Sequence, residues 1–120
     1  MELKEGMYVR YRYYNEQKIG KIEFIKQDER LNDDFIGLTN DNGVLEGNVL
    51  KASNNLINLI EEGDYVNGVE VIGKEFDNFN KEYLQCGVGD YVICTFEVKD
   101  IKTILTKEQF ESQKYIVESE

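Results

Sequence analysis

Alanine occurs only once in the 120 residues, at Ala52, and proline does not occur at all. Because alanine is the strongest helix former, a chain that almost lacks it has little tendency to build long helices. Valine, isoleucine, tyrosine and phenylalanine, which favour extended strands, are abundant instead. The sequence therefore predicts a mainly β protein.

Short segments of strand-like composition follow one another along the chain, most of them entered through a glycine or asparagine turn. The charged residues 27–34 are expected to form a mobile loop, and residues 40–43 (Asn-Asp-Asn-Gly) a hairpin turn. The strands are expected at residues 6–14, 18–25, 35–39, 44–50, 81–86, 91–97, 100–105 and 115–117.

The start of the second half repeats the start of the first. Residues 5–9 and 62–66 share the pattern Glu-Gly-x-Tyr-Val, and residues 19–21 and 72–74 share Ile-Gly-Lys. A third Gly-x-Tyr-Val string, Gly-Asp-Tyr-Val at residues 89–92, shows that such strings also arise wherever a turn leads into a strand. Duplication and chance therefore both remain open.

Two segments are candidates for short helices. Thr106 is followed three positions later by Gln109, the pattern of a capping box, so residues 106–113 are expected to be helical. The apolar run at residues 56–60 has the spacing of one helical face, but a buried extended crossover has the same composition. Strand spacing and these helices together suggest two small barrels of the SH3-like or Tudor-like kind in tandem.

The expected domain boundary lies in this apolar run. The first barrel spans residues 1–56, and the second spans residues 57–120 with the short C-terminal helix. Each barrel holds about 55 residues, a size at which a separate core is marginal, so the two could also form one integrated domain. We expect Leu56, Ile57, Leu59 and Ile60 to be buried where the halves meet.

Histidine is absent, which excludes Ser-His-Asp and Cys-His catalysis and histidine-containing zinc sites. The two cysteines cannot form a structural zinc site alone. Alternation across the expected hairpin places Cys86 opposite Tyr91 and Cys94 opposite Tyr83, which predicts free thiols. We expect no enzyme activity, cofactor or metal, and, without an apolar signal or membrane segment, a cytoplasmic protein.

Charge is distributed unevenly along the chain. The 14 basic and 24 acidic residues give a net charge of −10, yet residues 1–26 carry a net charge of +2. Strand alternation places one set of basic and aromatic residues on a single face: Tyr8, Arg10, Arg12 and Tyr14. Arginines between tyrosines can bind phosphates, stack on bases or anchor a protein interface. Alternatively, the opposite face forms the core and the arginines only pair with local carboxylates.

The acidic remainder of the chain is a second candidate surface. Carboxylates on a rigid β scaffold can imitate a phosphate backbone and occupy a basic cleft, although solubility alone also explains an acidic surface. Direct binding of nucleic acid is not expected, because this part of the chain repels a polyanion. The acidic binding residues proposed from the sequence are Asp28, Glu29, Asp33 and Asp34, with Asp41, Glu46, Glu61, Glu62, Asp64, Glu70, Glu75 and Asp77 as further contributors.

Two segments of the chain resemble a family of small prophage proteins from low-GC Gram-positive bacteria. The segments are residues 51–68 (Lys-Ala-Ser-Asn-Asn-Leu-Ile-Asn-Leu-Ile-Glu-Glu-Gly-Asp-Tyr-Val-Asn-Gly) and 100–111 (Asp-Ile-Lys-Thr-Ile-Leu-Thr-Lys-Glu-Gln-Phe-Glu). The resemblance covers mainly residues 51–115. It implies a genomic setting, but the family has no established activity from which functional residues could be transferred.

Small acidic prophage proteins are often accessory factors that bind and block host machinery. The resemblance therefore implies an inhibitor or adaptor of the anti-CRISPR kind, which acts through a protein interface on a host protein such as a basic nucleic-acid enzyme. The alternative is a protein that sequesters a small ligand or nucleotide.

Overall fold

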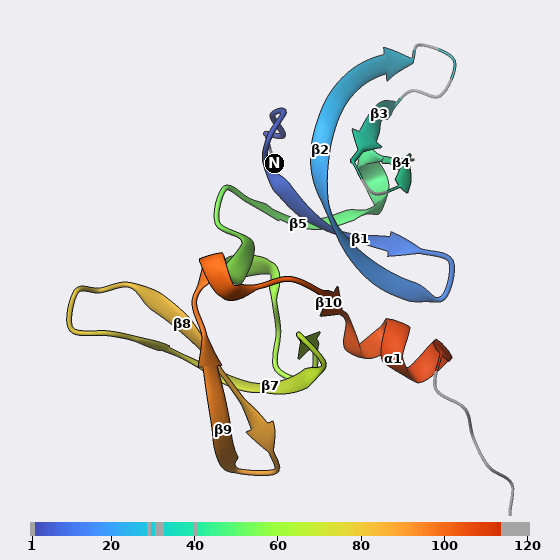
Figure 1. The fold of residues 1–120 in the computed structure, drawn as a ribbon. Coiled ribbons are helices and arrows are strands. Elements are labelled where there is room, and N and C mark those ends of the chain that lie inside the picture. Colours follow the sequence, from blue (N-terminus) through green and yellow to red (C-terminus); the bar gives the residue numbers. More distant parts are fainter. Residues whose placement is uncertain (1, 29, 31–32, 40, 114–120) are drawn as a thin grey trace, which may run out of the picture.

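The computed structural model describes residues 2–28, 30, 33–39 and 41–113, without the side chains of residues 28, 41, 42 and 113. The protein is mainly β, with 55% of residues in strands, which confirms the prediction from composition. Two five-stranded antiparallel sheets account for these strands, and one short helix follows them (Figure 1). No helix within the described residues is long and apolar enough to cross a membrane.

The first sheet is built from the first half of the chain. Its strand order is β4-β3-β2-β1-β5, and the 3-10 turn η1 (Glu46–Asn48) connects β4 to β5. The strands are β1 (Tyr8–Tyr13), β2 (Glu16–Asp28), β3 (Asp33–Leu38), β4 (Asp41–Leu45) and β5 (Val49–Ser53).

The second sheet has the strand order β10-β6-β7-β8-β9, and the 3-10 turn η3 (Val98–Asp100) precedes its last strand. The 3-10 turn η2 (Leu56–Leu59) connects the two sheets, and α1 (Lys107–Gln113) follows the second. The strands are β6 (Tyr65–Val66), β7 (Val69–Phe76), β8 (Glu82–Val88), β9 (Tyr91–Phe96) and β10 (Ile104–Leu105).

The two sheets have the same topology. In each, four strands form a meander, a 3-10 turn follows, and the fifth strand pairs back with the first. The turns that enter them also match: Gly6 donates to the carbonyl of Ile22 as Gly63 donates to that of Val71, both at 2.9 Å. Both glycines have a positive φ, +88° and +95°, which other residues rarely adopt. The repeated pattern at residues 5–9 and 62–66 therefore marks equivalent positions.

The Ile-Gly-Lys match between residues 19–21 and 72–74 does not mark equivalent positions. Because Ile22 is equivalent to Val71, residues 72–74 correspond to 23–25 and not to 19–21. The extra residues of the first half lie in its longer β1–β2 hairpin, since β6 contains only two residues.

Neither sheet is closed into a barrel. The edge strands are β4 and β5 in the first sheet and β9 and β10 in the second, and neither pair is hydrogen-bonded together. In the second sheet β10 has only two residues, which gives it little backbone with which to close the sheet.

Several expected elements differ from the observed ones. The charged residues expected to form a loop belong largely to β2 and β3, which extend as a hairpin to Asp28 and Asp33. The strand expected at residues 44–50 is divided by η1, and the turn expected at 40–43 is displaced because β4 already begins at Asp41. The strand expected at 115–117 lies outside the described residues.

Each sheet has its own buried apolar cluster. The first contains Val9, Tyr11, Ile22, Ile36, Leu38, Val44 and Val49, and the second contains Ile57, Ile60, Val66, Val71, Leu84 and Cys86. Burial of one such aliphatic side chain contributes about 1.5–3 kcal/mol, so each cluster stabilises its own sheet. Ile19 of β2 packs against the second cluster, so the clusters are linked by a first-half side chain.

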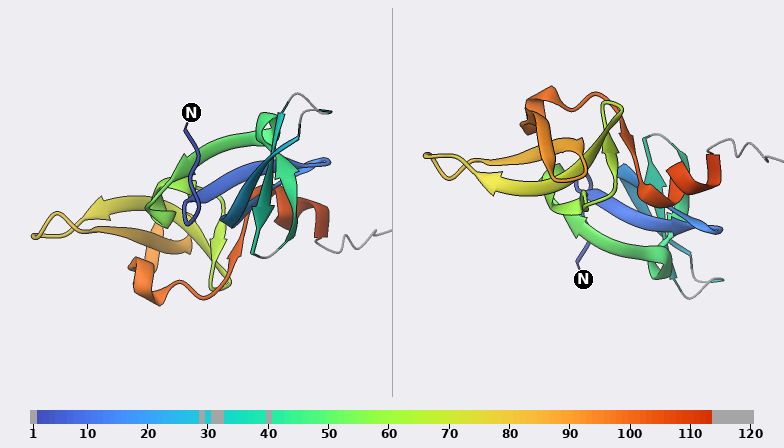
Figure 2. Two further views of the ribbon diagram at one scale, coloured as in Figure 1. Left: turned by 90° about the horizontal axis from the view of Figure 1, so that it is seen from above. Right: turned by 90° about the horizontal axis from the view of Figure 1, so that it is seen from below.

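The halves are also joined by the elements that follow each sheet. Ile57, Leu59 and Ile60 of the η2 region are buried, as expected, whereas Leu56 is only partly buried. The segment is a 3-10 turn and not an α-helix. Helix α1 crosses back to the first sheet and packs against β2, which is visible in Figures 1 and 2. Its Ser112 hydroxyl donates to the Glu16 carboxylate at 2.6 Å. These contacts cross the boundary expected at residue 56.

We expect Ile60→Asp to lower the free energy of unfolding by several kcal/mol, because it places an unpaired charge at a fully buried position. Asn58→Asp, two residues away at an exposed position, is the matched control and should change stability by less than about 0.5 kcal/mol. Urea denaturation followed by circular dichroism measures both. Equal stability of the two variants would contradict the packing described here.

Candidate functional site

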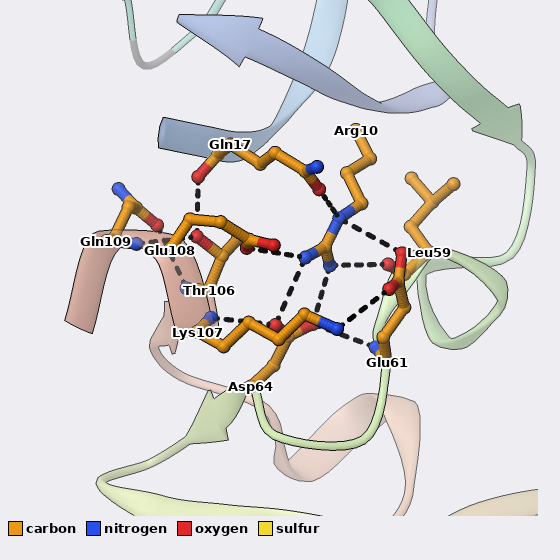
Figure 3. A network of polar contacts seen from close by, with 9 residues as sticks. All are labelled: Arg10, Gln17, Leu59, Glu61, Asp64, Thr106, Lys107, Glu108 and Gln109. Atoms are coloured by element: carbon orange, nitrogen blue, oxygen red, sulfur yellow. Dashed lines mark hydrogen bonds and ion pairs between the residues drawn. The ribbon is translucent and has the colours of Figure 1, made fainter. Parts of the chain in front are cut away.

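Arg10 of β1 is the centre of a polar network between the two halves (Figure 3). Its side chain is fully buried, and its guanidinium contacts groups from four separate segments. It donates to the Gln17 side chain at 2.6 Å, to the Leu59 carbonyl at 3.1 Å and to the Glu108 carboxylate at 3.1 Å. Glu61 lies 3.2 Å from its Nε atom. One side chain thus connects β2, the end of η2, the turn before β6 and α1.

Asp64 is the principal partner of Arg10. Its two carboxylate oxygens accept hydrogen bonds from the two terminal guanidinium nitrogens at 2.6 and 3.2 Å, a bidentate arrangement. The same oxygens accept from the backbone N–H of Glu61 at 2.8 Å and of Lys107 at 2.9 Å. Asp64 is itself fully buried, so this carboxylate fixes both the turn before β6 and the first residue of α1.

The electrostatic balance at Arg10 favours its charged form. Burial alone would lower the pKa of Arg10, but the hydrogen bond and charge of Asp64, with the charges of Glu61 and Glu108, raise that pKa above its ordinary value. The guanidinium is therefore a permanent buried cation. Its role in the structure is to hold the halves together.

The second end of this network is a capping box at α1. The Thr106 hydroxyl accepts from the N–H of Gln109 at 3.1 Å, and the Gln109 side chain accepts from the N–H of Thr106 at 3.0 Å. The Thr106 hydroxyl also donates to the Gln17 carbonyl of β2 at 2.5 Å. The helix expected from these two residues is confirmed, and its cap is fastened to the first sheet.

The burial of Arg10 changes the binding face expected on β1. Arg10 is not accessible to a partner, because its side chain faces the second half and not solvent. Tyr8 is half-buried at the opposite end of β1, where Lys21 lies 5.8 Å from its ring. Arg12 and Tyr14 are exposed at the β1–β2 turn. The expected set of four residues is thus reduced to Arg12 and Tyr14 as a surface pair.

Arg12 and Tyr14 line a shallow groove of about 450 Å³ in the first sheet. Its remaining wall includes Tyr13, Phe35 and Leu45. The Tyr13 and Tyr14 rings meet edge to face at 4.8 Å, and the Lys18 ammonium lies 4.1 Å from the Tyr13 ring centroid. A guanidinium beside aromatic rings can hold a planar or anionic group, which keeps the groove a candidate binding site.

The acidic group expected at residues 28–34 lies at the end of the β2–β3 hairpin. Asp33 has a structural role there, because its carboxylate accepts from the N–H of Asp34 at 3.0 Å and from the N–H of Gly47 in η1 at 2.9 Å. Asp34 is half-buried, and its binding role stays a prediction. Glu29 and the side chain of Asp28 lie outside the described residues. Asp64, also expected to display its charge, is buried against Arg10.

The two cysteines are directly opposite one another in the sheet. Cys86 of β8 pairs with Cys94 of β9, which contradicts the offset expected from the sequence. There are two reasons. Val88 pairs with Tyr91, so the turn contains two residues and not the four expected. In addition, Gly87 pairs with Val92, so Ile93 is an extra, bulged residue on β9. Both cysteines are free thiols, as expected. Burial, and then the neighbouring Cys94, raise the pKa of Cys86 to about 11.

Within the described residues, no group of three or more cysteine, aspartate or glutamate side chains is placed to hold a metal ion. Arg10, Asp64 and Glu108 use their polar atoms on one another, so this network is a structural device.

A feature that the sequence analysis missed is the exposed apolar surface of the second sheet, a set of side chains that lie mainly at its two hairpin ends. Seven large apolar side chains between residues 76 and 98 are exposed: Phe76, Phe79, Val88, Tyr91, Val92, Ile93 and Val98. The three consecutive residues 91–93 break the expected alternation of buried and exposed positions, because the bulge at Ile93 shifts the register. The apolar string at 91–93 was the available signal.

Phe79 is presented at the tip of the β7–β8 hairpin, which projects from the body in both views of Figure 2. The ring is 91% exposed. The turn beneath it is ordered, because the Asp77 carboxylate accepts from the N–H of Phe79 at 2.8 Å and of Lys81 at 2.9 Å. An exposed ring on a fixed turn is typical of an interface anchor, since little entropy is lost when a partner covers it.

Comparisons of this chain with protein-family models, with curated proteins and with solved structures gave no match. The functional argument therefore rests on the geometry above.

We expect Asp64→Ala to lower the free energy of unfolding by about 3–5 kcal/mol, because it leaves the buried Arg10 cation without its main partner. The double variant Arg10→Met/Asp64→Leu should recover much of this loss, since it removes both charges together. Chemical denaturation measures both effects. Arg12→Met, two residues along β1 and exposed, should change stability by less than about 0.5 kcal/mol and is the control. If Asp64→Ala were no less stable than this control, the network would not join the halves.

Cys86 should react slowly with iodoacetamide at pH 8 in the native protein. With a pKa of about 11, roughly one thiol in a thousand is ionised at that pH, against about a quarter for an unperturbed cysteine. Site-resolved mass spectrometry should show alkylation of Cys86 at least a hundredfold faster in denaturant. Because the raised pKa belongs to the folded state, the native rate should rise as the pH approaches 11. Labelling of native Cys86 at the denatured rate would contradict its burial.

Proposed function

We propose that this protein is a small acidic binding protein without enzyme activity, which acts through the second sheet on a basic host protein. An inhibitor of a nucleic-acid enzyme, of the anti-CRISPR kind and in a phage or prophage setting, fits this description best. The single observation that supports it is the exposed apolar surface between residues 76 and 98. Part of this proposal is that the protein works in the cytoplasm of the host.

The exposed apolar side chains are costly for a protein that stays alone. Each buried square ångström of apolar surface is worth about 25 cal/mol, so water contact with rings such as Phe79 and Tyr91 is a free energy that a partner can recover. Phe76 and Phe79 lie together at the β7–β8 end and Val88, Tyr91 and Val92 at the β8–β9 end, and neighbouring exposed apolar side chains of this kind are candidates for an interaction site. Because both sheets already have their own buried clusters, these side chains are available to a partner.

The charge around this surface favours a basic partner. Residues 65–98 contain six acidic residues and two basic residues, a net charge of −4. Opposite charge on the partner would accelerate association and select against acidic competitors. Nucleic-acid enzymes present basic channels of this kind, which is why they are the proposed class of target.

The SH3-like or Tudor-like relationship of the halves belongs to the same proposal. It is supported by the four-strand meander, the 3-10 turn and the return of the fifth strand to the first, which occur in both halves. On this interpretation each half is an opened form of a small barrel. The prophage family resemblance of residues 51–115 is likewise a proposal.

The alternative function, sequestration of a small ligand or nucleotide, is favoured by the groove at Arg12 and Tyr14. Its volume of about 450 Å³ is in the range of small-molecule sites, and a base could stack on the exposed Tyr14 ring while Arg12 holds a phosphate. The groove is open to solvent and lies in the first sheet, away from the exposed apolar surface. The two functions can therefore be tested separately.

We expect affinity purification from bacterial lysate to recover a basic protein, identified by mass spectrometry, that remains bound after nuclease treatment. Raising the salt concentration should weaken the complex, because exposed charge pairs are screened over about 8 Å at physiological ionic strength. Phe79→Ser/Tyr91→Ser should reduce recovery at least tenfold, whereas Arg12→Ala/Tyr14→Ala, in the groove, should not.

The opposite pattern would favour the alternative. Loss of binding in the groove variant alone, or a nucleotide released on heating with no bound protein, would refute the proposed function.

A further inference from the structure

Strand β9 forms an open edge of the second sheet. It pairs with β8 on one side, and no other described strand pairs with its second side. A strand edge presents unpaired backbone N–H and C=O groups, which are a template for another strand. Its residues are Tyr-Val-Ile-Cys-Thr-Phe, none of them charged. Tyr91, Ile93 and Val92 are 81%, 67% and 47% exposed.

The other described sheet edges are protected where β9 is not. Strand β5 contains Lys51 and β4 contains Asp41, and a charge on an edge strand discourages pairing. Strand β10 has only two residues, too few to pair stably. Bulges do not explain the difference, because the registers of β4, β5 and β9 are all interrupted by one. The lack of charge over a six-residue edge is specific to β9 among these four strands.

The charges around β9 indicate which strand it can accept. In a second copy of this chain, residues 65–98 carry the same net charge of −4 and would bring it to the β9 edge. Asp90 precedes β9 and Glu97, whose carboxylate lies 3.3 Å from the Lys99 ammonium, follows it. Two copies paired antiparallel would therefore place each Asp90 opposite a partly compensated carboxylate, with no basic group added. A strand with an uncharged centre and basic ends would instead be attracted, because its ends would lie near Asp90 and the other acidic residues of the second sheet. Charge complementarity thus favours a partner over self-association.

We propose that β9 accepts an added β-strand from a partner protein, and that this strand has about six uncharged, β-branched or aromatic residues flanked by lysine or arginine. Backbone hydrogen bonds would supply affinity, and the exposed Tyr91 and Ile93 side chains would select residues on the added strand. The inference rests on the proposed function, because it names the contact by which the second sheet holds its basic partner.

The test is a display library of random hexapeptides flanked on both sides by Lys-Lys, with a second library flanked by Glu-Glu. Full-length protein should select hexapeptides rich in valine, isoleucine, threonine, tyrosine and phenylalanine and free of proline, from the Lys-Lys library only. Binding of a selected synthetic peptide should slow amide hydrogen exchange in residues 91–96 and in no other edge strand.

Substitutions that add one positive charge distinguish a contact at the β9 edge from a general effect of the protein's net charge on peptide binding. Ile93→Lys and Thr95→Lys, both at exposed positions of β9, should weaken the selected peptide at least tenfold. Leu50→Lys makes the same change of charge on the exposed face of edge strand β5 and should weaken it less than twofold. Thermal melting of each variant checks that the fold is retained.

Several outcomes would overturn the proposal. They are an absence of binders, selection of proline-rich or helical sequences, equal selection from the Glu-Glu library, unchanged binding by the β9 variants, or a concentration-dependent dimer that the β9 variants abolish. A different result would separate this proposal from the proposed function. If lysate purification recovers a basic partner that binds Ile93→Lys as tightly as the unchanged protein, strand addition at β9 is wrong and the proposed function is supported. If hexapeptides bind β9 but no basic protein is recovered from lysate, β9 accepts added strands and the proposed function is wrong.

Discussion

The Arg10–Asp64 ion pair is the contact on which the arrangement of the two sheets depends. A buried ion pair gains little over a pair of well-packed apolar residues, but loss of one partner leaves a charge without compensation. Here the guanidinium also donates hydrogen bonds to Gln17, Leu59 and Glu108. Any other relative placement of the sheets would therefore leave the buried cation without these partners. The network therefore contributes more to the uniqueness of the arrangement than to its total stability.

The two sheets share one topology and equivalent entry turns, and the differences between them create the contact that joins them. Met7 in the first half occupies the position that Asp64 occupies in the second, since each accepts the same strand hydrogen bond through its carbonyl. Val9 corresponds to Val66, after which β6 ends and β1 continues to Arg10. The longer hairpin of the first half and the aspartate of the second half thus create a contact between the halves that neither sheet needs for its own core.

Composition and local patterns predicted much of this architecture. One alanine in 120 residues indicated a β protein, and Thr106 with Gln109 located α1 to within one residue. The cross-strand partners could not be predicted in the same way. The bulge at Ile93 moved Cys94 opposite Cys86, and alternation along β1 could not show that Arg10 faces an aspartate 54 residues away. Local periodicity specifies which side of a strand a residue occupies, whereas the packing of one sheet on another decides whether that side meets solvent.

The sequence positions of Arg10's partners have a consequence for synthesis. Asp64 lies 54 residues after Arg10 and Glu108 lies 98 residues after it, so a growing chain holds an arginine without these carboxylate partners until those residues have been synthesised. Contacts this far apart in sequence also carry a large entropy of closure, which slows the step that forms them. The first sheet can collapse early, but its final geometry waits for the last helix. The contact between the halves is therefore expected to form after each sheet has gathered its own buried cluster.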